Sequence, residues 1–170
     1  AMTVEEKVEI ARQLERLGVD IIEAGFPISS PGDFEAVQRI AREVRKPTIT
    51  ALAHANRAAV DRAAEAIKDA AHPRIHVFIS SSDQHIQTQL RKNREEVVEL
   101  AAQNVARARE HVDDVEFSPM DSSRTDKEFV AHIVRAAIGA GATTINIPDT
   151  VGYAIPEEFA GLLTYLREQV

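Results

Sequence analysis

The most informative segment of the sequence is Thr143-Thr-Ile-Asn-Ile-Pro-Asp-Thr-Val-Gly-Tyr153. Successive side chains of a β-strand point to opposite faces, so the two isoleucines would share one face while Asn146, Pro148 and Thr150 share the other. A buried strand with a polar row on one side, ending in Asp-Thr and then Gly, is typical of strands that carry functional groups to a site at their C-terminal end. We therefore expect a strand here, with a site beside its end.

The segments before it alternate between helical and strand patterns. Capping boxes mark three helix starts, at Thr3, Asn93 and Thr125, where a short polar residue is followed three positions later by glutamate. Helices are expected over residues 3–17, 31–44, 58–70, 93–111 and 125–141, and from 156 onward. Strands are expected over residues 19–26, 48–54, 74–81, 115–119 and 143–153. Because a helix fills each connection, the strands should be parallel, as in a doubly wound sheet or a (β/α)8 barrel.

The two faces of the expected strands distinguish these folds. One face is apolar, with Ile22, Ala53, Ile75, Val77, Ile79, Val115, Phe117, Ile145 and Ile147. The other face is polar or small, with Glu23, Gly25, Thr50, His54, Arg74, His76, Ser80, Glu116, Ser118, Asn146 and Thr150. A doubly wound sheet needs two apolar faces, whereas a barrel interior can be polar. A complete barrel needs about 250 residues and eight strands. The predicted fold is therefore α/β, a partial TIM (β/α)8 barrel of about five parallel strands alternating with helices.

Length and composition indicate a single soluble globular domain over residues 1–170, with 44% hydrophobic and 28% charged residues. The net charge of −7 argues against a nucleic-acid partner, and no apolar run is long enough to span a membrane. The absence of cysteine and of a signal-peptide pattern favours a cytoplasmic location. Ala1 before Met2 suggests that the chain starts inside a longer one.

Five motifs, placed in order along the chain, resemble one known family. They are Met2-Thr-Val-Glu-Glu-Lys7, Ile22-Glu-Ala-Gly-Phe-Pro27, Arg74-Ile-His-Val-Phe78, Val115-Glu-Phe-Ser118 with Arg124-Thr-Asp126, and the segment from Thr143 to Tyr153. Over essentially all of its length the chain resembles the catalytic domain of the 2-isopropylmalate synthase family, a barrel of the DRE-TIM metallolyase type. That family belongs with the homocitrate and citramalate synthases, which are Claisen-condensing, metal-dependent acyltransferases. Each motif alone is weak, but five in order make a specific signal.

The resemblance implies an acyltransferase of leucine biosynthesis that condenses acetyl-CoA with 2-oxoisovalerate, giving 2-isopropylmalate and free CoA. A divalent metal (Mg, Mn or Zn) would raise the electrophilicity of the oxo-acid carbonyl, and a base would remove a proton from the acetyl thioester. By motif, Thr150 would hydrogen-bond the oxo-acid carboxylate, and Glu23 would orient an arginine. The pocket for the isopropyl group would be walled by Leu52, His76, Ser118, Asn146 and Pro148. The full-length protein would be a homodimer.

The chain also departs from the family pattern. It shows neither the Arg-Asp pair of the family's first strand nor the His-x-His pair of the seventh, and the Gly-rich segment of the final strand is missing too. We therefore expect the first, seventh and eighth strands and the metal ligands to lie outside this chain, and the isolated chain to be inactive. Met120 occupies a position where many members have an active-site glutamate, and methionine carries no titratable proton. Either Asp121 or another group substitutes, or the role of that glutamate is not universal, and the catalytic base stays unidentified.

Other interpretations stay open at this point. His76 could be a satisfied interior histidine, Asp149 and Thr150 could cap the following turn, and Arg74 and Glu116 are expected to pair inside the barrel. Surface positions are expected for His54, His85, His111 and His132. For function, the alternatives are a related homocitrate or citramalate synthase, or a non-catalytic truncated barrel that can only associate.

Overall fold

The computed structural model describes residues 2–170 and contains one parallel sheet of five strands. The strands follow one another across the sheet in chain order, as β1 (Ile21–Gly25), β2 (Thr48–His54), β3 (Pro73–Ser80), β4 (Asp114–Met120) and β5 (Thr144–Ile145). Each connection contains at least one helix, as the alternating sequence pattern predicts. The predicted α/β fold with five parallel strands is confirmed.

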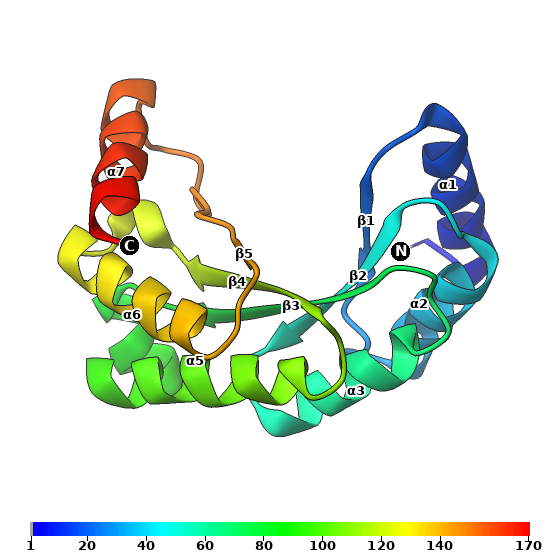
Figure 1. Ribbon diagram of the computed structural model, residues 1–170, viewed down its shortest axis with the longest axis horizontal. Coiled ribbons are helices and arrows are strands. Elements are labelled where there is room, and N and C mark those ends of the chain that lie inside the picture. The colour runs from blue at the N-terminus through cyan, green and yellow to red at the C-terminus, as the bar shows by residue number, and fades with distance from the viewer. Residues whose placement is uncertain (1) are drawn as a thin grey trace.

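The helices cover one face of this sheet and leave the other open. The main helices are α1 (Val4–Leu17), α2 (Pro31–Glu43), α3 (Arg57–Ile67), α5 (Arg94–Arg109), α6 (Lys127–Gly139) and α7 (Pro156–Gln169). Shorter elements are α4 (Asp83–His85), the π-helix η1 (Ile86–Leu90) and the 3-10 helix η2 (Ser122–Arg124). Figure 1 shows the sheet curved into a trough, with the helices on its convex side and the concave side uncovered. Within residues 2–170, no helix is both long and apolar enough to cross a bilayer.

The apolar face of the strands lies under the helices and forms the core. Ile75, Val77 and Ile79 of β3, with Val115 and Phe117 of β4, are completely buried. Burial of each such side chain contributes about 1.5–3 kcal/mol, so these two central strands anchor the fold. The isoleucines of the 143–153 segment also belong to this face, but they are only partly buried. The predicted division into an apolar convex face and a polar concave face is confirmed.

The last strand is much shorter than predicted. Only Thr144 and Ile145 are assigned to β5, whereas the sequence predicts a strand over residues 143–153. The backbone N–H of Asn146 still donates to the carbonyl oxygen of Phe117 at 3.0 Å, but the ladder then stops. Pro148 has no N–H to donate, and β5 pairs with β4 alone, so no second strand supports the rest of the segment.

Two of the three predicted capping boxes form. Thr3 and Glu6 cap α1, and Asn93 and Glu96 cap α5, each pair with reciprocal side-chain-to-backbone bonds. The prediction at Thr125 is wrong, because α6 is capped by Asp126, whose side chain accepts from the N–H of Phe129 at 3.0 Å. The hydroxyl of Thr125 is used elsewhere, since it lies 2.8 Å from the Ser81 hydroxyl and donates to the carbonyl of Asp121.

Candidate active site

A chain of polar side chains crosses the concave face of the sheet. His76 of β3 lies at its centre, with Nδ1 2.6 Å from Glu23 Oε2 of β1 and Nε2 2.7 Å from Ser118 Oγ of β4. The amide Nδ2 of Asn146, directly after β5, donates to the same Ser118 oxygen at 2.8 Å. His76 and Ser118 are buried, at 7% and 3% exposure, while the Glu23 side chain is 47% exposed. The curvature of the sheet thus links four residues that are far apart in the sequence.

A second polar group lies on the same face, toward the N-terminal ends of the strands. Arg74 donates from Nε to Asp114 at 2.8 Å and from Nη1 to Glu116 at 3.3 Å, which confirms the expected pairing of Arg74 with Glu116. The other oxygen of Glu116 lies 3.8 Å from His76 Nε2, so the two groups adjoin. The only buried side-chain oxygen without a hydrogen-bond partner in residues 2–170 is Thr50 Oγ1, whose residue pairs in register with Arg74.

The side of the face toward the C-terminal ends is more apolar. Leu52 pairs in register with His76, and Phe78 pairs with Ser118. The Phe78 ring packs edge-on against two aromatic rings, with centroids 5.9 Å from Phe26 and 5.2 Å from His54. Burial lowers the pKa of His54, so this imidazole is favoured in its neutral form beside the phenyl ring. A hydrocarbon group could therefore be held between Leu52 and this aromatic cluster.

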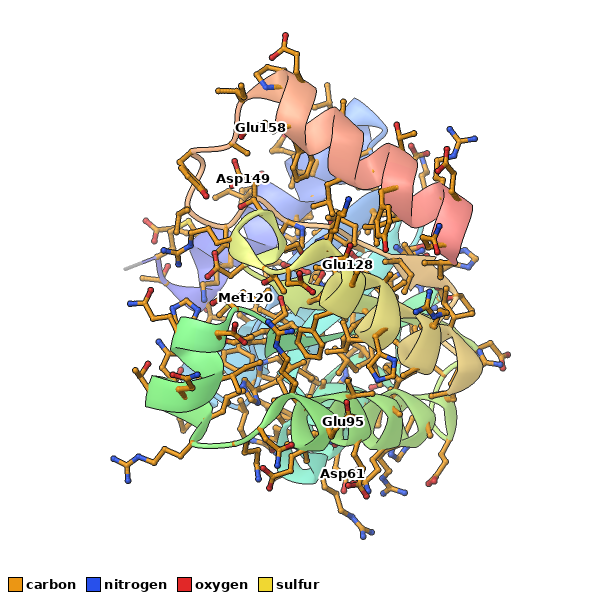
Figure 2. The ribbon with its side chains drawn as sticks, turned by 90° about the vertical axis from the view of Figure 1, so that its left-hand side faces the viewer. Asp61, Glu95, Met120, Glu128, Asp149 and Glu158 are labelled. Carbon is orange, nitrogen blue, oxygen red and sulfur yellow. The ribbon has the colours of Figure 1, made fainter. Side chains whose placement is uncertain are left out.

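The end of β4 holds a buried ion pair. Asp121 is completely buried, adopts a left-handed backbone conformation with φ 72°, and accepts two hydrogen bonds from Arg124, at 2.8 and 2.7 Å. Burial alone would raise the pKa of Asp121, but hydrogen bonds from Arg124 and Ser82 lower it. Both of its oxygens are engaged, so Asp121 supplies no free carboxylate in place of the side chain at Met120. Figure 2 shows Met120 and Asp149 on one side of the molecule, apart from Asp61 and Glu95 on the outer helices.

Not all of the histidines expected at the surface are there. His85 Nδ1 lies 3.3 Å from a carboxylate oxygen of Asp121 and 3.1 Å from Ser82 Oγ, with its side chain only 20% exposed. His54 is half-buried against Phe78. The surface expectation is therefore wrong for these two residues, because aromatic packing and a buried carboxylate hold them. His111 and His132 lie on the outside, near Asp61 and Glu95 respectively.

The segment after β5 is held by hydrogen bonds of its own. The oxygen of the Thr150 hydroxyl accepts from the backbone N–H of Asp121 at 2.9 Å, and its hydrogen stays available to donate. Asp149 accepts from Ser123 Oγ at 2.6 Å and from the N–H of Ala154 at 3.1 Å, and these bonds lower its pKa. Asp149 therefore caps the following turn, as one interpretation of the sequence expected. Pro148 is half-buried between Asn146 and this turn.

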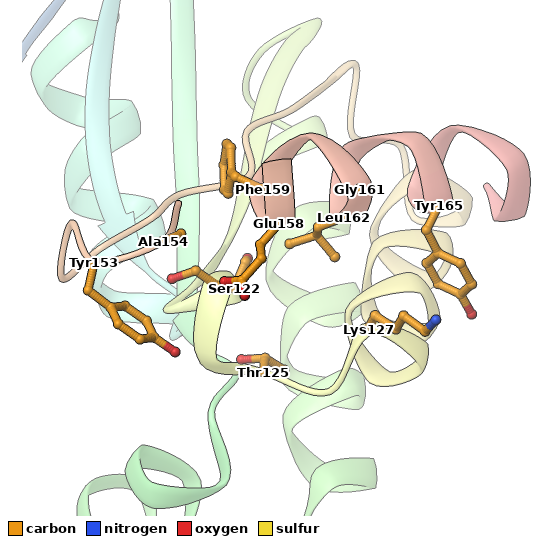
Figure 3. A pocket seen from close by; sticks show the side chains of 11 residues that line it. Ser122, Thr125, Lys127, Tyr153, Ala154, Glu158, Phe159, Gly161, Leu162 and Tyr165 are labelled. Carbon is orange, nitrogen blue, oxygen red and sulfur yellow. The ribbon is translucent and has the colours of Figure 1, made fainter. Parts of the chain in front are cut away.

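A cavity that the sequence did not predict lies beside this segment. It has a volume of about 430 Å³ and is lined by Ser122, Thr125, Lys127, Tyr153, Glu158 and Tyr165, among others. Figure 3 shows Tyr153 at one end and Lys127 with Tyr165 at the other, where the ammonium group lies 4.7 Å from the ring centroid. None of the predicted site residues lines it. Only the packing of α7 against α6 brings these positions together, so the spacing of residues in the sequence could not predict this cavity.

The described side chains do not fit a divalent metal. Within residues 2–170, no three His, Asp or Glu side chains converge on a point that could hold an ion. The carboxylates nearest the centre are already bonded, Glu23 to His76 and Glu116 to Arg74. Among these residues Glu23 contacts the imidazole of His76 and no arginine, and its expected role toward an arginine stays a prediction.

Comparison with known proteins places this geometry in context. The family model described as "HMGL-like" matches residues 1–170. Curated proteins named 2-isopropylmalate synthase are 61% identical in Syntrophus aciditrophicus and 57% identical in Pyrococcus furiosus, each over the whole chain. The chain spans about a third of those relatives, 33% and 34% of their lengths. In solved structures, hydroxymethylglutaryl-CoA lyase from Pseudomonas aeruginosa matches with a TM-score of 0.78 at 21% identity, covering 99% of this chain and 58% of that one. At that identity the likeness concerns the fold.

Proposed function

Because the chain belongs to the HMGL-like family, we propose that it is the central part of the catalytic barrel of a 2-isopropylmalate synthase. The observation that carries this proposal is the 61% identity with a curated protein of that name across the full length of the chain. The bonded group of Glu23, His76, Ser118 and Asn146 supports it, because strand alternation and the family motifs both single out these positions. In this proposal, residues 1–170 lack the first, seventh and eighth strands of the barrel.

The reaction would join the methyl carbon of acetyl-CoA to the carbonyl carbon of 2-oxoisovalerate. Loss of a methyl proton gives an enolate, which attacks the carbonyl; water then cleaves the thioester, releasing CoA and leaving 2-isopropylmalate. The residues of this chain would bind and orient the oxo acid. Leu52 and Pro148 would contact its isopropyl group beside His76, Ser118 and Asn146, while the free hydroxyl hydrogen of Thr150 would donate to its carboxylate.

We place the metal of this enzyme outside the described residues. A divalent ion (Mg, Mn or Zn) polarises the oxo-acid carbonyl when bound, and its ligands would come from other parts of the full-length protein. A homodimer and a cytoplasmic location belong to the same proposal for the full-length protein. Neither Met120 nor Asp121 is assigned as the catalytic base, since Met120 carries no titratable proton and Asp121 is bound to Arg124.

The test is an activity assay of the full-length protein that contains this chain. Release of CoA thiol from acetyl-CoA is followed with 2-oxoisovalerate, with pyruvate, with 2-oxoglutarate and with no oxo acid. We expect release with 2-oxoisovalerate to exceed the other three. A preference for pyruvate or 2-oxoglutarate would assign the protein to a citramalate or homocitrate synthase instead, and release with no oxo acid at all would indicate a simple thioesterase.

A further inference from the structure

The hydrogen bonds around His76 have a defined direction. An ionised carboxylate only accepts, so the 2.6 Å contact with Glu23 requires a hydrogen on Nδ1 of His76. In the neutral imidazole Nε2 then carries a lone pair and accepts from the Ser118 hydroxyl at 2.7 Å. The Ser118 oxygen in turn accepts from the amide of Asn146 at 2.8 Å. Donation therefore runs in one direction along the chain: Asn146 donates to Ser118, Ser118 donates to His76, and His76 donates to Glu23.

This direction leaves Ser118 with no hydrogen to offer a ligand. In the other tautomer, Nε2–H of His76 would donate to Ser118 Oγ, which also accepts from Asn146, and the hydroxyl hydrogen would turn away from the chain. The tautomer of one imidazole therefore decides whether the pocket contains a free hydroxyl donor. Of the groups around His76, Glu116 lies farther away at 3.8 Å and is already bonded to Arg74, and Leu52 on β2 is apolar.

We propose that Glu23 is a positioning residue that selects the Nδ1–H tautomer of His76, keeps the hydroxyl hydrogen of Ser118 out of the pocket, and so favours a 2-oxo acid with a hydrocarbon side chain. The inference rests on the proposed function for the nature of the substrate, but the tautomer itself does not depend on it. The apolar neighbours agree with this preference, since Leu52 and Phe78 lie in register with His76 and Ser118. A buried hydroxyl with a free hydrogen would instead favour a substrate with a polar side chain, because leaving a buried donor without an acceptor costs free energy.

The tautomer is tested directly by ¹⁵N NMR of the full-length protein labelled at histidine. Signals of His76 are identified by their loss in His76→Gln, and spectra are recorded where the imidazole is neutral. We expect a protonated Nδ1 and an unprotonated Nε2. Glu23→Ala should move the ring toward the Nε2–H form that free histidine favours, whereas Glu23→Gln should keep Nδ1–H, because its amide oxygen can accept the same bond. A protonated Nε2 in the wild type, or a ring unaffected by Glu23→Ala, would overturn the inference.

The consequence for the substrate is tested by selectivity. The competing substrate is 2-oxo-3-hydroxybutanoate, in which a hydroxyl replaces one methyl of 2-oxoisovalerate. We expect Glu23→Ala to lower the ratio of kcat/KM for 2-oxoisovalerate to kcat/KM for this analogue by roughly 3- to 10-fold, which corresponds to one neutral hydrogen bond. Glu23→Gln should keep most of the ratio. In Glu23→Ala with Ser118→Ala the fall should disappear, since no hydroxyl hydrogen is left. Glu95→Ala, on the outer helix α5, is the matched control.

These outcomes separate the inference from the proposed function. A ratio that is unchanged in Glu23→Ala, or that stays lowered in the double variant, contradicts the role of Glu23 while leaving the synthase assignment intact. A wild-type protein that condenses no oxo acid contradicts the synthase assignment, and the NMR spectra then still report the tautomer. Glu23 is half-exposed, so its substitution should leave the fold intact, and a thermal melt beside each assay checks this.

Discussion

Thr150 accepts a hydrogen bond from the backbone N–H of Asp121, and this contact joins the segment after β5 to the turn after β4. Asp121 is completely buried, adopts a left-handed backbone conformation and accepts two hydrogen bonds from Arg124, so the N–H that binds Thr150 belongs to a well-anchored residue. The hydroxyl oxygen of Thr150 is used by the protein, and its hydrogen is free for a ligand. A structural role and a carboxylate-binding role for Thr150 are therefore compatible, and mutagenesis can measure each.

Thr150→Ala in the full-length protein should lower both stability and catalysis. Loss of the bond from Asp121 should cost about 0.5–1.5 kcal/mol of unfolding free energy. Loss of a charge-assisted bond to the oxo acid should cost about 1.5–3 kcal/mol, which lowers kcat/KM for 2-oxoisovalerate by roughly 10- to 150-fold. Thr150→Ser keeps the hydroxyl and should retain most of both properties. A lowered melting temperature with unchanged oxo-acid kinetics would leave Thr150 with a structural role alone.

Asp33 should make stability depend on pH in the acid range. Hydrogen bonds from Lys7, Ser29 and Ser30 lower the pKa of Asp33 from 3.8 to about 2. A carboxylate with a lowered folded pKa stabilises the fold above its unfolded pKa, and this stabilisation is lost as the pH falls from about 4 to about 2. Because the group is partly exposed, the effect should be on the order of 1 kcal/mol.

The measurement is urea unfolding of the wild type and of Asp33→Asn across this pH range. The difference in unfolding free energy between the two proteins should be largest near neutral pH and should shrink toward pH 2. Glu95→Gln, a highly exposed carboxylate on the outer face, is the control and should show no such trend. A difference that stays constant with pH would mean that the charge of the Asp33 carboxylate does not stabilise the fold, since the backbone N–H that Asp33 donates to the N-cap Ser30 is kept in Asp33→Asn.

The chain of 170 residues alone should not catalyse the condensation. Within residues 2–170 no three side chains are placed to hold a metal ion, so the oxo-acid carbonyl would lack its electrophilic activation. Purified alone, the chain should release no CoA from acetyl-CoA in the presence of 2-oxoisovalerate, while the full-length protein does. Turnover above background that survives a chelator would show that these residues suffice for the chemistry.

The sequence predicted the fold well where local pattern and tertiary pairing agree. The strand over residues 48–54 was predicted with its observed limits, because β2 pairs with a neighbour on each side and its ends are set by local sequence. The segment from 143 to 153 has an equally good strand pattern, yet only Thr144 and Ile145 pair. The alternation of side chains indicates which residues could face a core, whereas the length of a strand also depends on its hydrogen bonds to neighbouring strands. β5 has a neighbour on one side only, which is β4.

The sequence predicted which polar side chains share the concave face but not which of them touch. Alternation along the strands placed Glu23, His76, Ser118 and Asn146 on one face, and the structure joins these four side chains by hydrogen bonds. Their roles in binding a substrate stay predictions. Which of the side chains touch depends on the curvature and stagger of the sheet, which side-chain parity does not encode. For that reason the contact between Glu23 and His76 was not predicted, and neither was the cavity between α6 and α7.

The guanidinium of Arg74 compensates the charges of two carboxylates on the concave face. Its side chain is 12% exposed and binds Asp114 and Glu116, both on the neighbouring strand. Arg74→Met keeps much of the apolar stem but leaves two adjacent acids uncompensated, so unfolding free energy should fall by about 3 kcal/mol. Adding Glu116→Gln removes one of these charges and should recover part of the loss. Urea unfolding of the wild type, the two single variants and the double variant measures this recovery.

Arg42→Met, which breaks the exposed pair with Asp69, is the matched control and should cost less than about 1 kcal/mol of unfolding free energy. Equal losses for Arg74→Met and Arg42→Met would mean that solvent already screens the acids on the concave face, and the loss should then not respond to Glu116→Gln.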